Sequence, residues 1–117
     1  MAISNEAAKI IKTGTTALSD KKAENIKVID ISEISVIADA LVIASGNNPK
    51  QIQAMSDEVD EKLSGAGFRH YCIEGYDNAN WILIGYDDVI FHLFDNETRS
   101  FYDLERLYRD GKEVDIQ

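Results

Sequence analysis

Two short apolar runs, residues 81–84 and 89–94, flank the sequence Gly-Tyr-Asp-Asp. Both runs are rich in aromatic and β-branched side chains, which favour strands, so the pattern predicts a β-hairpin. We expect a four-residue loop at residues 85–88, because a two-residue Tyr-Asp turn would require a positive φ at a bulky residue. This loop would place Trp81 opposite His92.

Side chains along a strand alternate between the two faces of the sheet, so the hairpin has two different faces. The first face would carry Ile82, Ile84, Val89 and Phe91. All four are apolar, and we expect this face to form part of the core. The second face would carry Leu83, Ile90, Trp81 and His92. Its mixture of apolar residues with a Trp–His pair is more typical of a contact surface.

The first part of the chain shows one helical pattern followed by two strand patterns. Apolar or small residues recur at helical spacing over residues 3–20, and Ser4 is a suitable N-cap. Gly14 and the two threonines that follow it weaken this helix, so it could fray or bend. Residues 26–31 and 38–45 are expected to be strands joined by a short turn, and the apolar run of the second strand indicates burial on both faces.

The middle of the chain predicts a second helix and a third strand. Asn48 is a suitable N-cap and Pro49 a suitable first residue for a helix that ends near Gly65. Its buried stripe would be Ile52, Met55, Val59 and Leu63. Residues 68–73 are expected to form the third strand, and a right-handed crossover would make it parallel to the strand before the helix.

After the hairpin, Asn96 could cap a last helix, whose apolar face would be Phe101, Leu104, Leu107 and Tyr108. The expected order is therefore α-β-β-α-β-β-β-α. This order predicts a single α/β domain over residues 1–117, with a mixed five-stranded sheet, three helices, a core at about residues 4–109 and a tail at residues 110–117. Three helices would cover only part of such a sheet, and a partly bare face or edge is a natural place for a partner.

Charge and composition narrow the class of protein. The chain has 117 residues and a net charge of −9, from 12 Lys and Arg against 21 Asp and Glu. This balance argues against general binding to nucleic acid, which needs clustered cations. No apolar run is long enough to span a bilayer, no signal peptide opens the chain, and the single Cys72 fits a reducing cytoplasm.

The acids are unevenly distributed. Residues 70–98 contain no Lys or Arg but hold six acids: Glu74, Asp77, Asp87, Asp88, Asp95 and Glu97. These acids lie near Tyr76, Trp81 and Tyr86 in the sequence. Acids mixed with aromatic residues would suit a surface for a basic protein partner. A solvated acidic edge that only keeps the protein soluble would give the same pattern.

The sequence offers little support for catalysis, a metal or a cofactor. Ser45-Gly46 before a helix could offer N–H groups to an anion, but no Walker or GxGxxG motif is present, and a tight turn explains it. His70 and Cys72 alternate onto one strand face without a third ligand. The pairs Asp87-Asp88 and Asp103-x-Glu105 would point apart, so they do not form a site for metal ions.

Several ordered motifs nevertheless resemble one family. They are Lys21-Lys22-Ala23-Glu24-Asn25-Ile26, Ile37-Ala38-Asp39, Val42-Ile43-Ala44-Ser45-Gly46, Glu74-Gly75, Trp81-Ile82-Leu83, Asp88-Val89-Ile90, His92 and the run Arg99 to Leu107. Together they are similar to the ribosomal silencing factor family, also called Iojap-like, over about residues 4–109. The resemblance implies a nucleotidyltransferase-like fold without catalysis.

The resemblance also implies a function. Members bind a large-subunit ribosomal protein of the L-fourteen type at the face where the subunits join, block joining of the small subunit, and reduce translation when nutrients are short. They are often homodimers. On this basis the partner is the large ribosomal subunit, with little direct binding to nucleic acid, and the protein is a cytoplasmic regulator rather than an enzyme.

The same resemblance suggests contact residues. Trp81 would anchor the partner, His92 would support it, and Asp87, Asp88 and Glu74 would pair with basic side chains; further neighbours would be Tyr76, Tyr86, Arg99 and Tyr102. Three positions depart from the family pattern: Gly85 and Asp87 are exchanged, Ala40-Leu41 replaces an aromatic pair, and Tyr108 replaces a tryptophan. The alternative function is a nucleotide-binding or nucleotidyl-transferring enzyme that uses the Ser45-Gly46 corner.

Overall fold

The computed structural model describes residues 3–114. The elements in chain order are α1 (Asn5–Asp20), β1 (Glu24–Asp30), β2 (Ala40–Gly46), α2 (Pro49–Gly65), β3 (Cys72–Glu74), β4 (Trp81–Tyr86), β5 (Val89–Asp95), α3 (Asn96–Tyr102), α4 (Leu104–Leu107) and β6 (Lys112–Val114). The strands form one mixed sheet in the order β3-β4-β5-β2-β1-β6. The predicted α/β class is thus confirmed.

The sheet has six strands rather than the expected five. Part of the segment expected to be a tail forms β6, which pairs antiparallel with β1 through Val28 and Val114; residues 115–117 lie outside the described residues. Strand β2 pairs with β5 in parallel, whereas the other neighbouring strands pair antiparallel. Strand β3 runs in the same direction as β2, as expected, but β4 and β5 lie between them.

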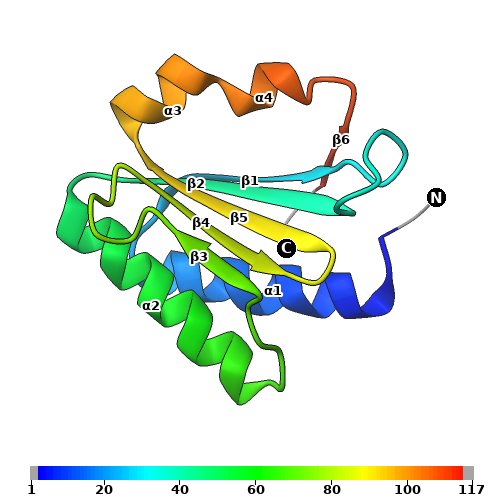
Figure 1. Ribbon diagram of the computed structural model, residues 1–117, viewed down its shortest axis with the longest axis horizontal. Helices are drawn as coiled ribbons and strands as arrows, with labels where there is room; N and C mark the ends of the chain where they lie inside the picture. Colours follow the sequence, from blue (N-terminus) through cyan, green and yellow to red (C-terminus); the bar gives the residue numbers. More distant parts are fainter. Residues whose placement is uncertain (1–2, 115–117) are drawn as a thin grey trace.

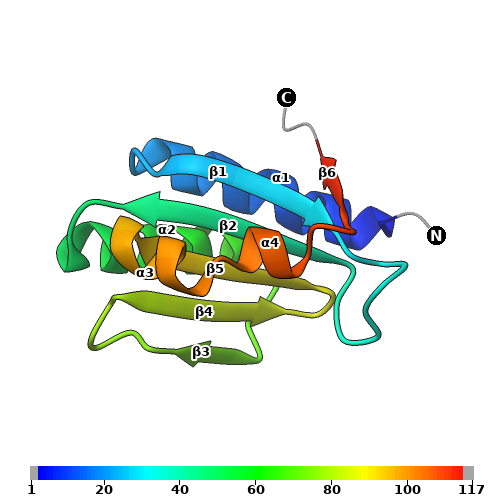
Figure 2. The ribbon, with the colours of Figure 1, turned by 90° about the horizontal axis from the view of Figure 1, so that it is seen from above.

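The helices cover the two faces of the sheet unequally. Helices α1 and α2 lie along one face, and α3 and α4 lie on the other (Figure 1). Viewed from above, α3 and α4 lie over β2 and β5 and leave β3 and β4 bare (Figure 2). This uncovered part of the face that carries α3 and α4 is called the bare face below.

The two long helices begin and pack as their sequences predict. The Ser4 side chain accepts a hydrogen bond from the Ala7 amide at 3.1 Å, and Asn48 accepts one from the Gln51 amide at 2.8 Å. Each cap satisfies a backbone donor that the first turn of a helix leaves free. The expected stripe on α2 is buried: Ile52, Met55, Val59 and Leu63. Strand β2 is buried at every position, as its apolar run indicates.

The hairpin register differs from the prediction by two residues. Strand β4 continues through Tyr86, which pairs with Val89, so the turn consists of Asp87 and Asp88 and Trp81 pairs with Phe94. Asp87 takes the positive φ of +42°, and aspartate tolerates this conformation better than a bulky residue does. The predicted four-residue loop at residues 85–88 is therefore wrong, and among two-residue turns the prediction considered only Tyr-Asp. Because a shift of two keeps every side chain on its face, the assignment of the faces remains correct.

The C-terminal helix and the third strand also differ from the predictions. Asp95, not Asn96, caps α3 by accepting from the Thr98 amide at 2.7 Å. Asp103 has a φ of +49°, which ends α3 and separates it from α4. The expected apolar face is therefore divided, and Phe101 is 80% exposed. The third strand is only Cys72–Glu74, because most of the expected 68–73 segment is irregular.

Gly14 allows α1 to lie close against the sheet. The helix is unbroken from Asn5 to Asp20, so the expected weakness at Gly14 does not interrupt it. A Cβ atom at Gly14 would lie 2.2 Å from Cζ of Phe91 on β5, which is closer than any real contact. The glycine is therefore required by the close approach of helix and strand rather than by its own φ.

We expect Gly14→Ala to lower the free energy of unfolding by about 1–3 kcal/mol, because overpacking the core outweighs the better helix propensity of alanine. The matched control is Gly65→Ala at the end of α2, where a Cβ atom would meet nothing within 4 Å. Urea unfolding of both variants checks this. Equal stability of the two variants would contradict the steric role of Gly14.

Candidate functional site

Alternate side chains of three strands form the bare face and its border with α3 and α4. Register and alternation place Cys72 and Glu74 of β3 on it, with Trp81, Leu83 and Gly85 of β4 and Ile90, His92 and Phe94 of β5. Leu83 and Ile90 are partly exposed, and Glu74 is exposed. The ring of Tyr71 covers Gly85, where an added Cβ atom would lie 2.4 Å from Cζ of the tyrosine. Gly85, His92 and Phe94 are buried, so this face is largely apolar but only partly open to solvent.

An aromatic cluster occupies the end of this face next to α3. The Trp81 ring centroid lies 5.0 Å from that of Phe94, 4.7 Å from Tyr102 and 5.8 Å from His92. The indole Nε1–H donates to Nδ1 of His92 at 3.0 Å. These four residues are called the aromatic platform below. Trp81 is partly exposed, so it belongs both to the packing under α3 and to the molecular surface.

His92 is the least exposed polar member of the platform. Its side chain lies on the expected face, but diagonally to Trp81 rather than directly opposite, because Leu83 is its pairing partner. Only 7% of the residue is exposed, and burial lowers the pKa of His92 from 6.5 to about 4. The ring is therefore neutral at neutral pH, which leaves Nδ1 free to accept from Trp81.

The Arg99 side chain is buried and bonds to other residues of the chain. It is 8% exposed; its Nη1 donates to Oγ of Ser45 at 2.7 Å, and its Nε and Nη2 donate to Oε2 of Glu105 at 3.2 and 2.9 Å. The guanidinium thereby ties α3 to the end of β2 and to α4. Little of the Arg99 side chain is therefore left for a partner, and its expected role as a neighbour of the partner stays a prediction. Sequence reasoning missed Ser45 and Glu105 as its partners, although the Arg99 to Leu107 motif contains two of the three residues.

Helices α3 and α4 carry exposed aromatic and apolar side chains next to the aromatic platform. Tyr102 is 50% exposed and Leu107 is 70% exposed. A shallow depression of about 390 Å³ lies here, lined by Phe101, Tyr102, Asp103, Arg106, Leu107, Arg109 and Asp110. Large exposed side chains gathered in one region mark an interaction surface more often than scattered ones do.

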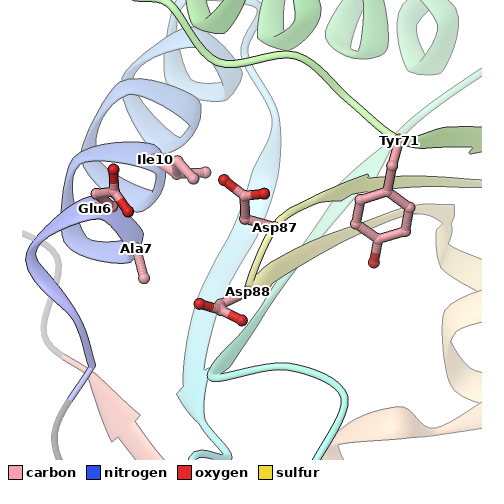
Figure 3. Close-up of a pocket in the computed structure, with 6 residues that line it drawn as sticks. All are labelled: Glu6, Ala7, Ile10, Tyr71, Asp87 and Asp88. Atoms are coloured by element: carbon pink, nitrogen blue, oxygen red, sulfur yellow. The ribbon is translucent and has the colours of Figure 1, made fainter.

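Asp87 and Asp88 lie at the other end of the hairpin from the platform. They form the turn, and with Glu6, Ala7, Ile10 and Tyr71 they line an open pocket of about 520 Å³ (Figure 3). Trp81 opens β4 and Asp87 follows its last residue. At about 3.3 Å per residue, the acidic turn is therefore roughly 20 Å from Trp81, the expected anchor. The structure does not bring these two expected parts of the site together.

Tyr86 and Tyr76 face α2 rather than a partner. Tyr86 is 1% exposed on the core side of β4, and its hydroxyl donates to Oδ1 of Asp60 at 2.7 Å. Burial, with this hydrogen bond, raises the pKa of Tyr86 above its usual range. The Tyr86 side chain is therefore not accessible in this structure, and its expected role in contacts stays a prediction. Tyr76 is partly buried, and its hydroxyl donates to Asp57 at 3.0 Å.

The Ser45-Gly46 corner has its polar groups engaged within the chain. Ser45 accepts from Arg99, and the Asn47 amide donates to Oε1 of Gln51 at 2.7 Å. A Cβ atom at Gly46 would lie 2.8 Å from Cγ1 of Ile52, so this glycine serves the packing of α2. These contacts favour the structural explanation of the corner over a phosphate site.

The remaining candidate groups do not form a metal site. His70 bonds to Asp60 through Nδ1 at 2.8 Å. Within residues 3–114, no three His, Cys, Asp or Glu side chains are arranged to hold a metal ion. In the same range, no helix is both long and apolar enough to cross a bilayer.

Comparison with known proteins identifies relatives over nearly the whole chain. The model of the family "Ribosomal silencing factor during starvation" (RsfS) matches residues 4–117. The chain is 37% identical to the ribosomal silencing factor RsfS of Bacillus subtilis over 107 residues, covering 92% of this chain and 91% of that one. It is 40% identical to RsfS of Zymomonas mobilis over 106 residues, with 91% and 80% covered. A crystal structure of a Chromobacterium violaceum protein superposes with a TM-score of 0.86 at 28% identity, with 93% and 90% covered.

The low pKa of His92 predicts a pH dependence of stability. Between pH 6.5 and about 4 the unfolded chain binds a proton at this residue that the folded protein does not, so acidification favours unfolding. We expect the free energy of unfolding to fall by up to ~1.4 kcal/mol per pH unit from this residue over that range. Urea unfolding at several pH values, followed by circular dichroism, measures it.

His92→Asn removes the titrating group but keeps an acceptor near the position of Nδ1, so its stability should depend less on pH over the same range. His70→Asn is the control, since His70 lies on the other side of the sheet, against α2. Parallel pH profiles for the wild type and His92→Asn would contradict the assignment.

Proposed function

The chain belongs to the ribosomal silencing factor family, and we propose that it represses translation by occupying the large ribosomal subunit. In this proposal it binds the L-fourteen-type protein and sterically blocks joining of the small subunit when nutrients are limiting. It works in the cytoplasm, forms homodimers when free, and needs no catalytic group. The match of the family model to residues 4–117 is the observation that carries the proposal.

The bare face supports this proposal as the docking surface. It presents partly exposed Trp81, Leu83 and Ile90 beside the exposed Tyr102. Aromatic residues are enriched at the centres of protein interfaces, where a few of them supply most of the binding energy. Helices α3 and α4 leave β3 and β4 uncovered (Figure 2), and the three side chains are already partly exposed, so a partner could reach them without any rearrangement of the fold.

The charge distribution supports a basic protein as the partner. The net charge is −9, and exposed acids lie beside the bare face at Glu74 and at the hairpin turn in Asp87 and Asp88. Ribosomal proteins are typically basic, so the partner and this surface would attract each other. The same acids would repel exposed phosphates, which favours a protein contact over a contact with ribosomal RNA.

We expect the protein to co-sediment with isolated large subunits and not with small ones. Added before mixing, it should also reduce the amount of complete ribosomes that form from the two subunits, because the docked protein occupies the joining surface. Sucrose-gradient sedimentation measures both results. Equal binding to the two subunits, or binding to neither, would contradict the proposal.

If Asp87 and Asp88 steer a basic partner, association should slow as ionic strength rises, because the Debye length is about 8 Å at physiological salt. The double variant Asp87→Asn, Asp88→Asn should have a lower on-rate at low salt and a weaker salt dependence, measured by stopped-flow. The matched control is Asp20→Asn with Glu61→Gln, which changes the net charge equally at exposed positions of α1 and α2. Equal effects of the two pairs would show that only the net charge matters.

Trp81→Ala should affect both binding and stability, because the ring is partly buried against Phe94 and Tyr102. We expect a stability loss of about 1–3 kcal/mol, less than the full loss for a buried aromatic. Binding should weaken about thirtyfold or more, roughly 2 kcal/mol, in the range of an interface anchor. Chemical unfolding and titration onto large subunits measure the two effects.

The control for stability is Ile82→Val, which removes one methylene from the neighbouring residue on the core side of β4. This variant should lose stability without losing affinity. If it bound as weakly as Trp81→Ala, the effect of Trp81 would be an effect on folding. If Trp81→Ala bound large subunits as tightly as the wild type, Trp81 would not be part of the docking surface.

A further inference from the structure

The hydrogen bond between Trp81 and His92 determines which nitrogen of the histidine carries the proton. The indole N–H can only donate, so Nδ1 of His92 must accept, with 3.0 Å between the two nitrogens. A neutral imidazole has one donor and one acceptor nitrogen. His92 therefore carries its proton on Nε2, and Trp81 has no polar hydrogen left to offer to a partner.

The Nε2 atom of His92 has no hydrogen-bond partner within the described residues. Over the same range, no side-chain nitrogen or oxygen is both fully buried and unpartnered. Nε2 must therefore reach the surface, although the residue as a whole is only 7% exposed. The result is a fixed N–H donor with some access to solvent, on a residue that the register places on the same face of the sheet as Leu83 and Ile90.

We propose that this Nε2–H group is the donor through which the docking surface recognises a backbone carbonyl of its protein partner. The proposal rests on the proposed function and specifies its chemistry at one atom. His92 would thus contact the partner directly, in addition to holding Trp81 in place. The chemical class of the acceptor follows from the surroundings of the ring.

The surroundings favour an uncharged acceptor from a protein. Leu83 pairs with His92 across the hairpin, and Ile90 is its neighbour on the same face of β5. Glu74 pairs with Leu83 on the next strand, which places a carboxylate on this face and opposes a phosphate or a second carboxylate. A neutral N–H donor in an apolar environment is matched best by a neutral carbonyl.

The donor would contribute to specificity as well as to affinity. When a partner covers the platform, water loses access to Nε2, and the N–H group must then find an acceptor or remain unpaired. A partner surface without a carbonyl at this position would leave the N–H group buried and without a hydrogen bond. Its binding would therefore be weaker than expected from the apolar area it buries.

The tautomer can be tested on the free protein. The chain has only two histidines, so ¹⁵N-histidine labelling gives two ring systems, and His70→Gln assigns them. We expect long-range ¹H–¹⁵N spectra at neutral pH to show a protonated Nε2 and an unprotonated Nδ1 for His92. A protonated Nδ1, or rapid exchange between both forms, would overturn the proposal without any bearing on ribosome binding.

The role in binding is tested with two substitutions of His92. One keeps a hydrogen-bond acceptor near the position of Nδ1, and the other keeps a donor near the position of Nε2. The amide oxygen of His92→Asn can replace Nδ1 as acceptor for Trp81 but leaves no outward donor, so affinity for large subunits should fall about tenfold. The amide of His92→Gln reaches the position of Nε2 and can donate, so it should retain more affinity than His92→Asn. The fluorescence of Trp81, the single tryptophan, reports whether the platform is intact in each variant.

His70→Asn is the matched control, because His70 contacts Asp60 of α2 and lies outside the proposed docking surface. It should bind like the wild type. If His92→Asn is folded and binds like the wild type, or if His92→Gln binds less well than His92→Asn, the proposal is overturned. If the wild type itself does not bind large subunits, the proposed function fails, and with it the identity of the partner.

Discussion

The burial of β2 on both sides is the constraint on which the rest of the structure depends. All seven of its positions are buried, and it lies between β5 and β1 near the middle of the sheet. A strand of this kind needs cover on both faces. Two long helices supply it on one face, but α3 and α4 have only seven and four residues. They cover the centre of the sheet but not β3 and β4 at its edge. The bare face therefore exists because α3 and α4 are much shorter than α1 and α2.

The short helices are held by a buried charge as well as by apolar contacts. Arg99 joins Ser45 at the end of β2 to Glu105 in α4 and lies almost wholly inside. A buried guanidinium is tolerated only where it is paired and hydrogen-bonded, which fixes the geometry of its neighbours. The turn at Asp103 then directs Leu104 into an apolar cluster that also contains Ile43 of β2 and Phe94 of β5. Tyr102, the residue before that turn, is thereby held over Trp81.

The sequence predicted the elements and faces better than the contacts between them. Periodicity found the faces of β4 and β5, which survive a register error of two residues because side chains alternate. Strand β6 was missed, since three residues carry almost no pattern and pair only through the tertiary fold. Tyr86 and Arg99 were assigned to the surface, because nothing local in the sequence shows their distant partners Asp60 and Ser45. Burial of such polar side chains depends on residues far away in the chain.

If the proposed docking surface is correct, the separation of Trp81 from Asp87 and Asp88 divides recognition of the partner into two physical steps. About 20 Å along β4 lies between them, which exceeds the Debye length of about 8 Å at physiological salt. Under the proposed function, the acids at the turn would act on an approaching partner through the general field of the surface and would change the on-rate. The aromatic platform would act only at contact, where buried aromatic area and the proposed donor at His92 would slow dissociation. A partner that touches both ends must span the whole hairpin, so a large, basic and rigid surface fits this arrangement better than a short peptide does.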